Sequence, residues 1–349
     1  MPTDIMIRPM QPEDGSELAM LYVQSPDTGS VTVTPRYLID PYVDQIVSRP
    51  TAKGVVAVAA GGGLIGAGVV VFETRRVAGE VRSCALLSGL VVHPAFRGQG
   101  VATRLTQWRI AQARECLGPN VILLAGVQHN NARSLAVARH WMNTVAGVFH
   151  SIMVRPQTRS PRARPDWRVR PATAVEWAVL AQCLNRFYAD YEYAPLFSAE
   201  SLPAWLHYAP TGEPLRTLYV VVDADGKLLA GCGVSQSYRV REMYIERLPN
   251  SMRLINWLMR VVPPDGIMRP ISVSHLWYQP GHVEALRYLW ETLAWQARER
   301  ANAVLTYYDP RSQLPDLLRL PRWLPKGRLT FVTWQDQPSS SSKRLFPPI

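Results

Sequence analysis

The sequence predicts an α/β fold of the mixed α+β kind, made of two tandem domains, each with a mixed twisted central sheet flanked by helices. Three observations lead to this prediction. Apolar runs of strand length alternate along the chain with segments of helical periodicity. A glycine-rich turn joins a strand to a helix within residues 87–105. The pattern of the first half recurs in the second half, and such self-similarity indicates two copies of one fold.

The composition is typical of a chain that buries a large core. The chain has 349 residues, of which 47% are hydrophobic and 19% charged, and this length favours two domains. No segment reaches the ~18 uninterrupted apolar residues of a membrane span. The first residues lack the basic and apolar regions of a signal peptide. We therefore expect a cytoplasmic protein.

The net charge of +11 comes almost entirely from arginine. A positive field of this size attracts small anions or nucleic acid, although an arginine-rich genome would explain the charge equally well. The arginines are spread along the chain rather than clustered, which disfavours nucleic-acid binding. The cysteines are widely spaced and have no nearby histidine cluster, so we expect reduced core residues and neither disulfides nor a metal site at Cys84, Cys116, Cys183 and Cys232.

The first half reads as strand, helices, hairpin, strand, helix, strand, helix and strand. The hairpin is predicted by three consecutive glycines at 61–63 between two apolar runs. Residues 26–50 are less regular. The expected strands are 7–9, 54–60, 64–72, 87–92, 121–128 and 149–154, and the expected helices begin near residues 14, 101 and 131.

The glycine-rich turn predicts an anion site. Residues 87–92 form an apolar strand that Pro94 must end, because proline cannot donate to a strand ladder. Gly98 and Gly100 can adopt positive φ, and without Cβ atoms they let an oxygen-rich group approach the backbone closely. The N–H groups of the helix that follows would point at that group, and a diphosphate is its natural identity.

Two common phosphate-binding motifs fit this spacing poorly. A P-loop needs Gly-x-x-x-x-Gly-Lys-Ser/Thr, which this segment lacks. A dinucleotide fold needs a third glycine where Thr103 stands and an acid at the end of the next strand, where Gln128 stands. The segment Arg97-Gly98-Gln99-Gly100-Val101-Ala102 resembles instead the acetyl-CoA signature Arg/Gln-x-x-Gly-x-Gly/Ala of the GCN5-related N-acetyltransferases (GNAT). The order of elements over residues 5–155 is also similar to that of this family.

The resemblance implies an acyl-CoA-dependent N-acetyltransferase without a metal. Its co-substrate is acetyl-CoA, and its acceptor is a primary amine of a small molecule or a peptide. The implied cofactor-binding residues lie on the strand before the turn, on the turn with its helix, and at the start of the next helix. They are Leu90, Val91, Val92, Arg97, Gly98, Gln99, Gly100, Val101, Ala102, Thr103 and Asn131.

The resemblance leaves the catalytic residues unassigned. In the family a tyrosine protonates the departing thiolate, but Ala138 stands at its position here. The titratable side chains nearest the motif are Glu73, His129 and His140, and a histidine suits proton transfer by its pKa. Each of them is more often a structural residue. The alternative interpretation is therefore a catalytically inactive module that binds CoA or acyl-CoA as a sensor or scaffold.

The second half repeats the pattern without the glycine turn. Residues 169–171 echo residues 7–9 at an offset of 162, and a second hairpin echoes the first. The strand at 271–278 runs into a proline, but no Gly-x-Gly follows, and Glu284 would repel phosphates. We therefore expect a degenerate copy, in an arrangement similar to that of mycothiol synthase-like double-domain acetyltransferases.

These observations give four expected regions. Residues 1–155 are a GNAT domain that binds acetyl-CoA, and residues 167–335 are a degenerate GNAT-like domain. A segment rich in proline and arginine, 156–166, links them. The serine-rich segment 336–349 is expected to be a flexible tail.

Overall fold

The structure, a computed structural model, describes residues 5–28, 31–336 and 342–347. Its first half contains all the expected strands and helices. The strands expected at 64–72 and 87–92 are longer than expected, because Ala78 and Gly79 both adopt positive φ and join them in a tight turn. The elements are β1 (Ile5–Pro9), α1 (Gly15–Gln24), β2 (Asp27–Thr28), β3 (Thr32–Tyr37), β4 (Ala52–Ala59), β5 (Leu64–Val77), β6 (Glu80–Val92), α2 (Val101–Leu117), β7 (Ile122–Gln128), α3 (Ala132–Arg139) and β8 (Thr144–Val154).

The second half repeats this order and adds short elements. They are β9 (Arg168–Pro171), α4 (Trp177–Phe187), β10 (Tyr191–Glu192), β11 (Ala194–Pro195), α5 (Ser201–Leu206), β12 (Arg216–Val222), β13 (Leu228–Ser235), β14 (Arg241–Arg247), α6 (Asn250–Met259), β15 (Ile267–Met268), β16 (Pro270–Tyr278), α7 (Val283–Ala297), β17 (Ala303–Tyr308), α8 (Leu314–Leu317), β18 (Lys326–Trp334) and β19 (Arg344–Leu345).

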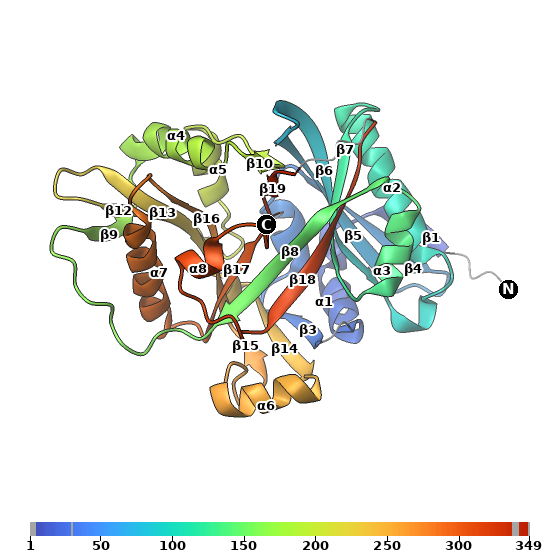
Figure 1. Ribbon diagram of the computed structural model, residues 1–349. Helices are drawn as coiled ribbons and strands as arrows, with labels where there is room; N and C mark the ends of the chain where they lie inside the picture. The colour runs from blue at the N-terminus through green and yellow to red at the C-terminus, as the bar shows by residue number, and fades with distance from the viewer. Residues whose placement is uncertain (1–4, 29–30, 337–341, 348–349) are drawn as a thin grey trace.

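Over the described residues, one continuous sheet crosses the whole molecule (Figure 1). Its order is β1-β4-β5-β6-β7-β18-β8-β17-β16-β13-β12-β9, with β11 beside β5. The order is the same from either end when each strand is matched with its repeat. The mixed α/β fold of two tandem units is thereby confirmed.

The last strand of each half lies in the other half of the sheet. β18 pairs antiparallel with β7 on one side and with β8 on the other, and β8 in turn pairs with β17. The buried rings of Phe149 in β8 and Phe331 in β18 meet edge to face, with centroids 5.2 Å apart. The two halves of the chain therefore share their closing strands, and the sheet of neither half is complete alone.

The repeat extends to single ion pairs. In the first half Arg8 of β1 donates to Asp14 at 2.7 Å, across the turn that leads into α1. In the second half Arg170 of β9 donates to Glu176 at 2.6 Å, across the turn that leads into α4. The two pairs lie at the offset of 162 residues that relates the halves, so both units fix their first helix to their first strand in the same way.

The helices α1 and α2 cover opposite faces of the first half. In β4, Val56 faces Leu18 and Leu21 of α1, whereas its neighbour Val55 faces Leu105 of α2. Successive side chains of a strand point to opposite faces, so an apolar strand of this kind needs a helix on each side. The middle of β4 and the first half of β5 are accordingly buried on both faces.

A second, small sheet joins the halves. Its order is β15-β14-β3-β2, and the pairing of β14 with β3 brings strands of both halves together. The irregular segment 26–50 supplies β2, β3 and the π-helical turn Val43–Val47. Because Tyr208 of the second half donates to the buried carboxylate of Asp44 in that turn, the contact between the halves includes a buried polar pair.

Two expectations need correction. Of the expected tail, residues 337–341 and 348–349 lie outside the described residues, but β19 pairs with β10, and both Leu345 and Phe346 are buried. Apolar side chains after the serines explain this packing. Cys116 is exposed, whereas the other three cysteines are buried as expected, and all four are free. Among the described residues, no helix is long and apolar enough to cross a membrane.

Candidate functional site

The glycine-rich turn lies between β6 and α2. Gly98 and Gly100 both have a φ of 80°, and a Cβ atom built on either glycine would meet no atom within 4 Å. A hydrogen bond stabilises the conformation of the turn, because Arg97 Nε donates to the carbonyl of Val92 at 3.0 Å. The backbone ahead of α2 is therefore both fixed in shape and open to solvent, as an anion site at a helix N-terminus requires.

The side chains beside the turn carry positive charge. Burial, and then the neighbouring Arg133, lower the pKa of Arg97. Two guanidinium groups brought close together without a carboxylate are stabilised by a bound anion. Arg133 lies on α3, two residues after Asn131, and sequence reasoning missed it. The signal that could have identified it is an arginine in the first turn of the helix that follows β7.

The strands β6 and β7 separate before either of them ends. Their parallel pairing covers only Cys84 to Leu86 of β6, so the edge of β6 beyond Leu86 faces no strand there. The pairing of β6 with β5 skips between Ala67 and Val69, which places a β-bulge at Gly89, whose φ is 61°. The predicted contact residues Leu90, Val91 and Val92 lie on this open edge, each half-buried.

A buried arginine supports the bulge. Arg109 of α2 is only 2% exposed, and its Nη1 donates to the carbonyls of Val69 at 3.4 Å and Ser88 at 3.1 Å. Burial lowers the pKa of Arg109 to about 10, so it is still charged at neutral pH. Gly68 makes room for it, since a Cβ there would lie 3.1 Å from Arg109 Nε. Sequence reasoning did not single out Arg109.

Asn131 caps the helix that follows β7. Its Oδ1 accepts a hydrogen bond from the backbone N–H of Ser134 at 3.0 Å, so its side-chain NH₂ is the group left to meet a ligand. Ala138, seven residues on, is 3% exposed and packs in a cluster with Val127 and Leu123. The place of the family's tyrosine is therefore part of the core.

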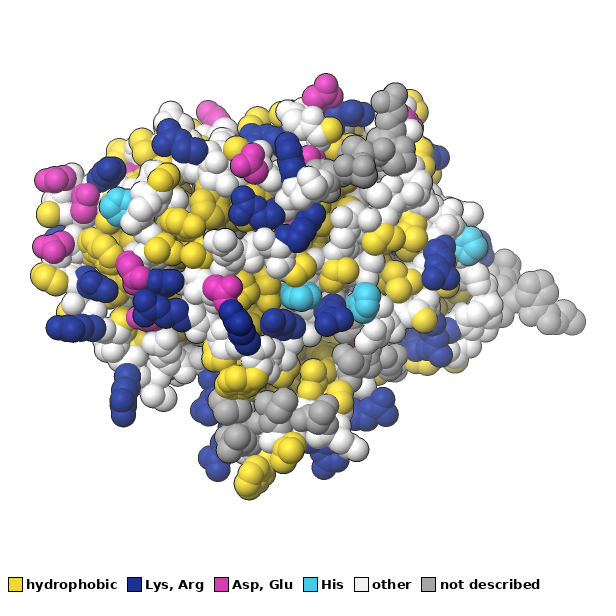
Figure 2. All heavy atoms as spheres, viewed as in Figure 1, with side chains coloured by type: hydrophobic (Ala, Val, Ile, Leu, Met, Phe, Trp, Pro, Cys, Tyr) yellow, Lys and Arg dark blue, Asp and Glu magenta, His cyan; other side chains and the backbone are white. Residues whose placement is uncertain are grey.

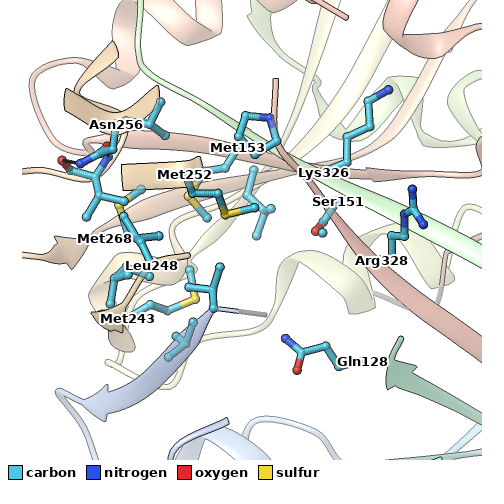
Figure 3. Close-up of a pocket in the computed structure, with 18 of the residues that line it drawn as sticks. Gln128, Ser151, Met153, Met243, Leu248, Met252, Asn256, Met268, Lys326 and Arg328 are labelled. Atoms are coloured by element: carbon cyan, nitrogen blue, oxygen red, sulfur yellow. Dashed lines mark hydrogen bonds between the residues drawn. The ribbon is translucent and has the colours of Figure 1, made fainter. Parts of the chain in front are cut away.

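A cavity of about 590 Å³ lies beside the carboxyl end of β7 (Figure 3). Its floor is formed by the central strands β7, β18, β8 and β17, and its roof by β3, β14, β15 and α6. Both halves thus build it. The residues from Gln128 to Asn130, which directly precede Asn131, belong to its wall.

The three titratable candidates lie in different places. Glu73 forms an ion pair with the buried Arg75 at 2.7 Å. His140 ends α3 on the surface. His129 lines the cavity, and its Nδ1 lies 3.0 Å from Thr330 Oγ1 of β18. Tyr307 of β17 also lines the cavity. Sequence reasoning did not connect Tyr307 with the site, because this residue lies in the second half of the chain.

The matching position of the second half is lined by aromatic side chains. β16 also separates from β17, and a non-glycine residue with positive φ, His275, stands at its bulge. The ring of His275 packs against Trp205 at 4.9 Å and against Phe346, and burial lowers its pKa to about 3. At the start of α7, Glu284 forms ion pairs with Arg287 and Arg319. Aromatic side chains thus line this position, which keeps a cavity of about 200 Å³ bounded by His275 and Leu276 of β16 and by Tyr307 of β17.

The family comparison agrees with this geometry. The model of the acetyltransferase (GNAT) family matches residues 19–142, which include the open edge of β6, the glycine turn and Asn131. Residues 19–142 form a GNAT acetyltransferase domain. The open edge and the turn described above are thus features of a GNAT domain, and the second half is its structural repeat. No curated protein sequence matches the chain.

Solved structures extend the GNAT likeness to the whole chain. Saccharomyces cerevisiae N-myristoyltransferase with bound myristoyl-CoA is 12% identical, with a TM-score of 0.68 over 96% of this chain and 83% of that chain. A GCN5-related N-acetyltransferase from Sphaerobacter thermophilus is 15% identical, with a TM-score of 0.57 over 97% and 98%. One from Kribbella flavida is 13% identical, with a TM-score of 0.53 over 95% and 71%. The tandem GNAT fold is therefore shared.

Proposed function

We propose that this protein is an acyl-CoA-dependent N-acyltransferase that transfers an acetyl group from acetyl-CoA to a primary amine of a small molecule or a peptide. The main support for this proposal is that one GNAT domain contains both an open glycine-rich turn and a strand, β6, with a free edge. The N-myristoyltransferase of similar fold binds myristoyl-CoA, which supports an acyl-CoA as the co-substrate.

The first half would hold the acyl-CoA. The backbone N–H groups of residues 98–103 would bind the diphosphate, with Arg97 and Arg133 adding charge. The backbone of residues 90–92 would hydrogen-bond the amides of the pantetheine arm and the thioester carbonyl. Polarising this carbonyl stabilises the negative charge that develops on its oxygen when the amine attacks.

The amine would approach from the cavity. His129 is the titratable group of the GNAT domain that lines it, so it is our candidate to take the proton of the attacking amine. Because Ala138 replaces the family's tyrosine, the leaving thiolate would take a proton from water or from Tyr307, a phenol in the cavity wall. A thiol with a pKa near ~8.5 is a good enough leaving group for either route.

A second function is favoured by one set of residues. Ala138 stands where the family has its tyrosine, and Glu73 forms an ion pair with Arg75, so the family's acid is missing and one candidate base is engaged. A module that binds acyl-CoA without turnover is the alternative.

One assay separates the two functions. A panel of primary amines and peptides is incubated with acetyl-CoA, thiol release is followed, and acetyl-CoA binding is measured by calorimetry. Release above hydrolysis with at least one amine, lost in His129→Ala and kept in His140→Ala, supports the transferase and the role of His129. Binding without release from any amine supports the sensor or scaffold. An absence of binding contradicts both.

A further inference from the structure

The cavity beside β7 has two chemically different ends. In Figure 3 the thioether side chains gather at one end, whereas Gln128, Ser151 and Arg328 lie toward the other. Of the described residues that line the cavity, none is acidic. A ligand that matches both ends must itself be amphipathic, with an apolar body and groups that pair with cations and amides.

The apolar end is rich in methionine. Four methionines from four different elements meet there, with Leu248 beside them. They are Met153 of β8, Met243 of β14, Met252 of α6 and Met268 of β15. Methionine side chains are flexible and polarizable, so a wall of this kind adapts to apolar groups of different shape. Most of them remain half-buried in the structure, which leaves apolar surface for a ligand to cover.

The polar end carries cations without acidic partners. Lys326 and Arg328, on the first residues of β18, are exposed at its mouth, and no described carboxylate forms an ion pair with either. Burial, and then Arg328 and Lys326, lower the pKa of the nearby His150, which reflects the positive potential of this region. A carboxylate entering here would meet two cations, of which the arginine can bind it bidentately.

A buried hydrogen-bond acceptor without a partner belongs to the cavity wall. Gln128 Oε1 is buried and has no hydrogen-bond partner among the described residues. Gln128 ends β7, the strand that borders the open edge of β6. An unpaired buried carbonyl is costly, and the N–H of a ligand amine would satisfy it.

We propose, on the basis of the acyltransferase function above, that the acceptor is a short apolar peptide with a free carboxyl group. Its amine donates to Gln128, its carboxylate pairs with Lys326 and Arg328, and its apolar side chains lie among the methionines. Both halves then recognise the acceptor, and the degenerate half supplies most of the apolar surface.

The test uses three dipeptides: Leu-Phe, its carboxamide, and Gly-Gly. Calorimetry in the absence of acetyl-CoA gives each Kd for the full-length protein, and thiol release gives KM. We expect Leu-Phe to bind at least about tenfold more tightly than the other two, which is ~1.4 kcal/mol of discrimination. The double variant Lys326→Gln with Arg328→Gln weakens Leu-Phe and leaves the carboxamide unchanged. Met252→Asp weakens both apolar peptides and leaves Gly-Gly unchanged.

The matched control removes two cations elsewhere. Arg159→Gln with Lys227→Gln makes the same change in net charge at exposed sites away from the cavity wall, and it leaves all three dipeptides unchanged. An equal loss in this control would mean that net charge, and not the mouth of the cavity, attracts the peptide. That result overturns the proposal.

The remaining outcomes separate the proposal from the function on which it rests. Equal binding of the three dipeptides, together with thiol release from other amines, overturns the peptide and keeps the acyltransferase. Selective binding of Leu-Phe without thiol release keeps the pocket and overturns the acyltransferase. If Met252→Asp weakens myristoyl-CoA and leaves Leu-Phe unaffected, the cavity holds an acyl chain and the peptide proposal is wrong.

Discussion

At the scale of single residues, the site depends on backbone positions that few side chains tolerate. Gly98 and Gly100 occupy the left-handed region, where a Cβ atom costs roughly 1–2 kcal/mol. Gly281 of the second half has the same conformation, with a φ of 82°, and the same open surroundings. The same substitution can therefore be made at Gly100, inside the proposed site, and at Gly281, outside it.

We expect Gly100→Glu to abolish acetyl-CoA binding and Gly281→Glu to leave it intact. Both variants bear the same backbone strain, so the difference reports the clash and the charge that the glutamate brings to the phosphates. Calorimetric titration of the two variants measures it. Equal losses would show that the strain or the fold, and not a diphosphate site in the first half, is responsible.

Arg109 gives a second expectation at this scale. In Arg109→Met the carbonyls of Val69 and Ser88 lose their donor, at a cost of about 1–3 kcal/mol for an unpaired buried group. We expect lower stability in urea unfolding and a higher KM for acetyl-CoA, because the bulge at Gly89 loses its support. Arg114→Met, an exposed neighbour on the same helix that stacks over Trp334, is the control for KM. Unchanged stability would mean that relief of the buried charge offsets the lost bonds.

At the scale of elements, much of the site could be predicted. Residues 87–105 showed the strand, the turn and the helix because proline and glycine act locally, and the half-buried edge at Leu90 to Val92 follows from them. The long-range parts could not be predicted. His129 meets Thr330 only because β18 lies beside β7, and nothing in the sequence around either residue indicates that neighbour.

The ion pair between β9 and the turn before α4 has a definite pH dependence. Hydrogen bonds from Arg170, and then from Thr173, lower the pKa of Glu176 from 4.5 to about 2. A carboxyl whose pKa is lower in the folded state stabilises the fold above pH 4.5, and that contribution is lost as the pH falls toward 2. We therefore expect Glu176→Gln to be less stable than the natural protein at pH 7, with a gap that closes over this range.

Thermal unfolding between pH 2 and pH 7 measures that gap. Glu299→Gln is the control, since its pair with Arg298 is exposed and contributes little. A gap for Glu176→Gln that stays constant with pH would show that packing of the turn, and not the charge of Glu176, holds the first helix of the second unit.

At the scale of the whole molecule, the two halves exchange their closing strands. The expected order of elements in each half is correct, but the partners of β8 and β18 are not those of two separate sheets. Both strands bury apolar side chains on both of their faces, Phe149 and Ile152 in one and Phe331 and Val332 in the other. The local sequence pattern therefore does not indicate whether β8 or β18 pairs with β7. The positive charge is spread over the face seen in Figure 2 rather than gathered on one element.

We expect a chain that ends at residue 324 to lose acetyl-CoA binding, although every predicted CoA contact precedes that point. Without β18, the strands β7 and β8 lose their common partner, and the buried side chains of Leu124 and Phe149 become exposed. Circular dichroism and calorimetry of the truncated protein measure the effect. Retained binding with native stability would show that the site does not need β18.

The late position of β18 in the sequence also affects how the chain folds during biosynthesis. As the chain leaves the ribosome, β7 and β8 are made long before Lys326 begins β18, so both carry open apolar edges while the second half is still being translated. Such edges are places where nascent chains associate with one another. The sheet beside the GNAT turn closes only when β18 emerges, and we infer that the yield of active protein depends on keeping these edges protected during that interval.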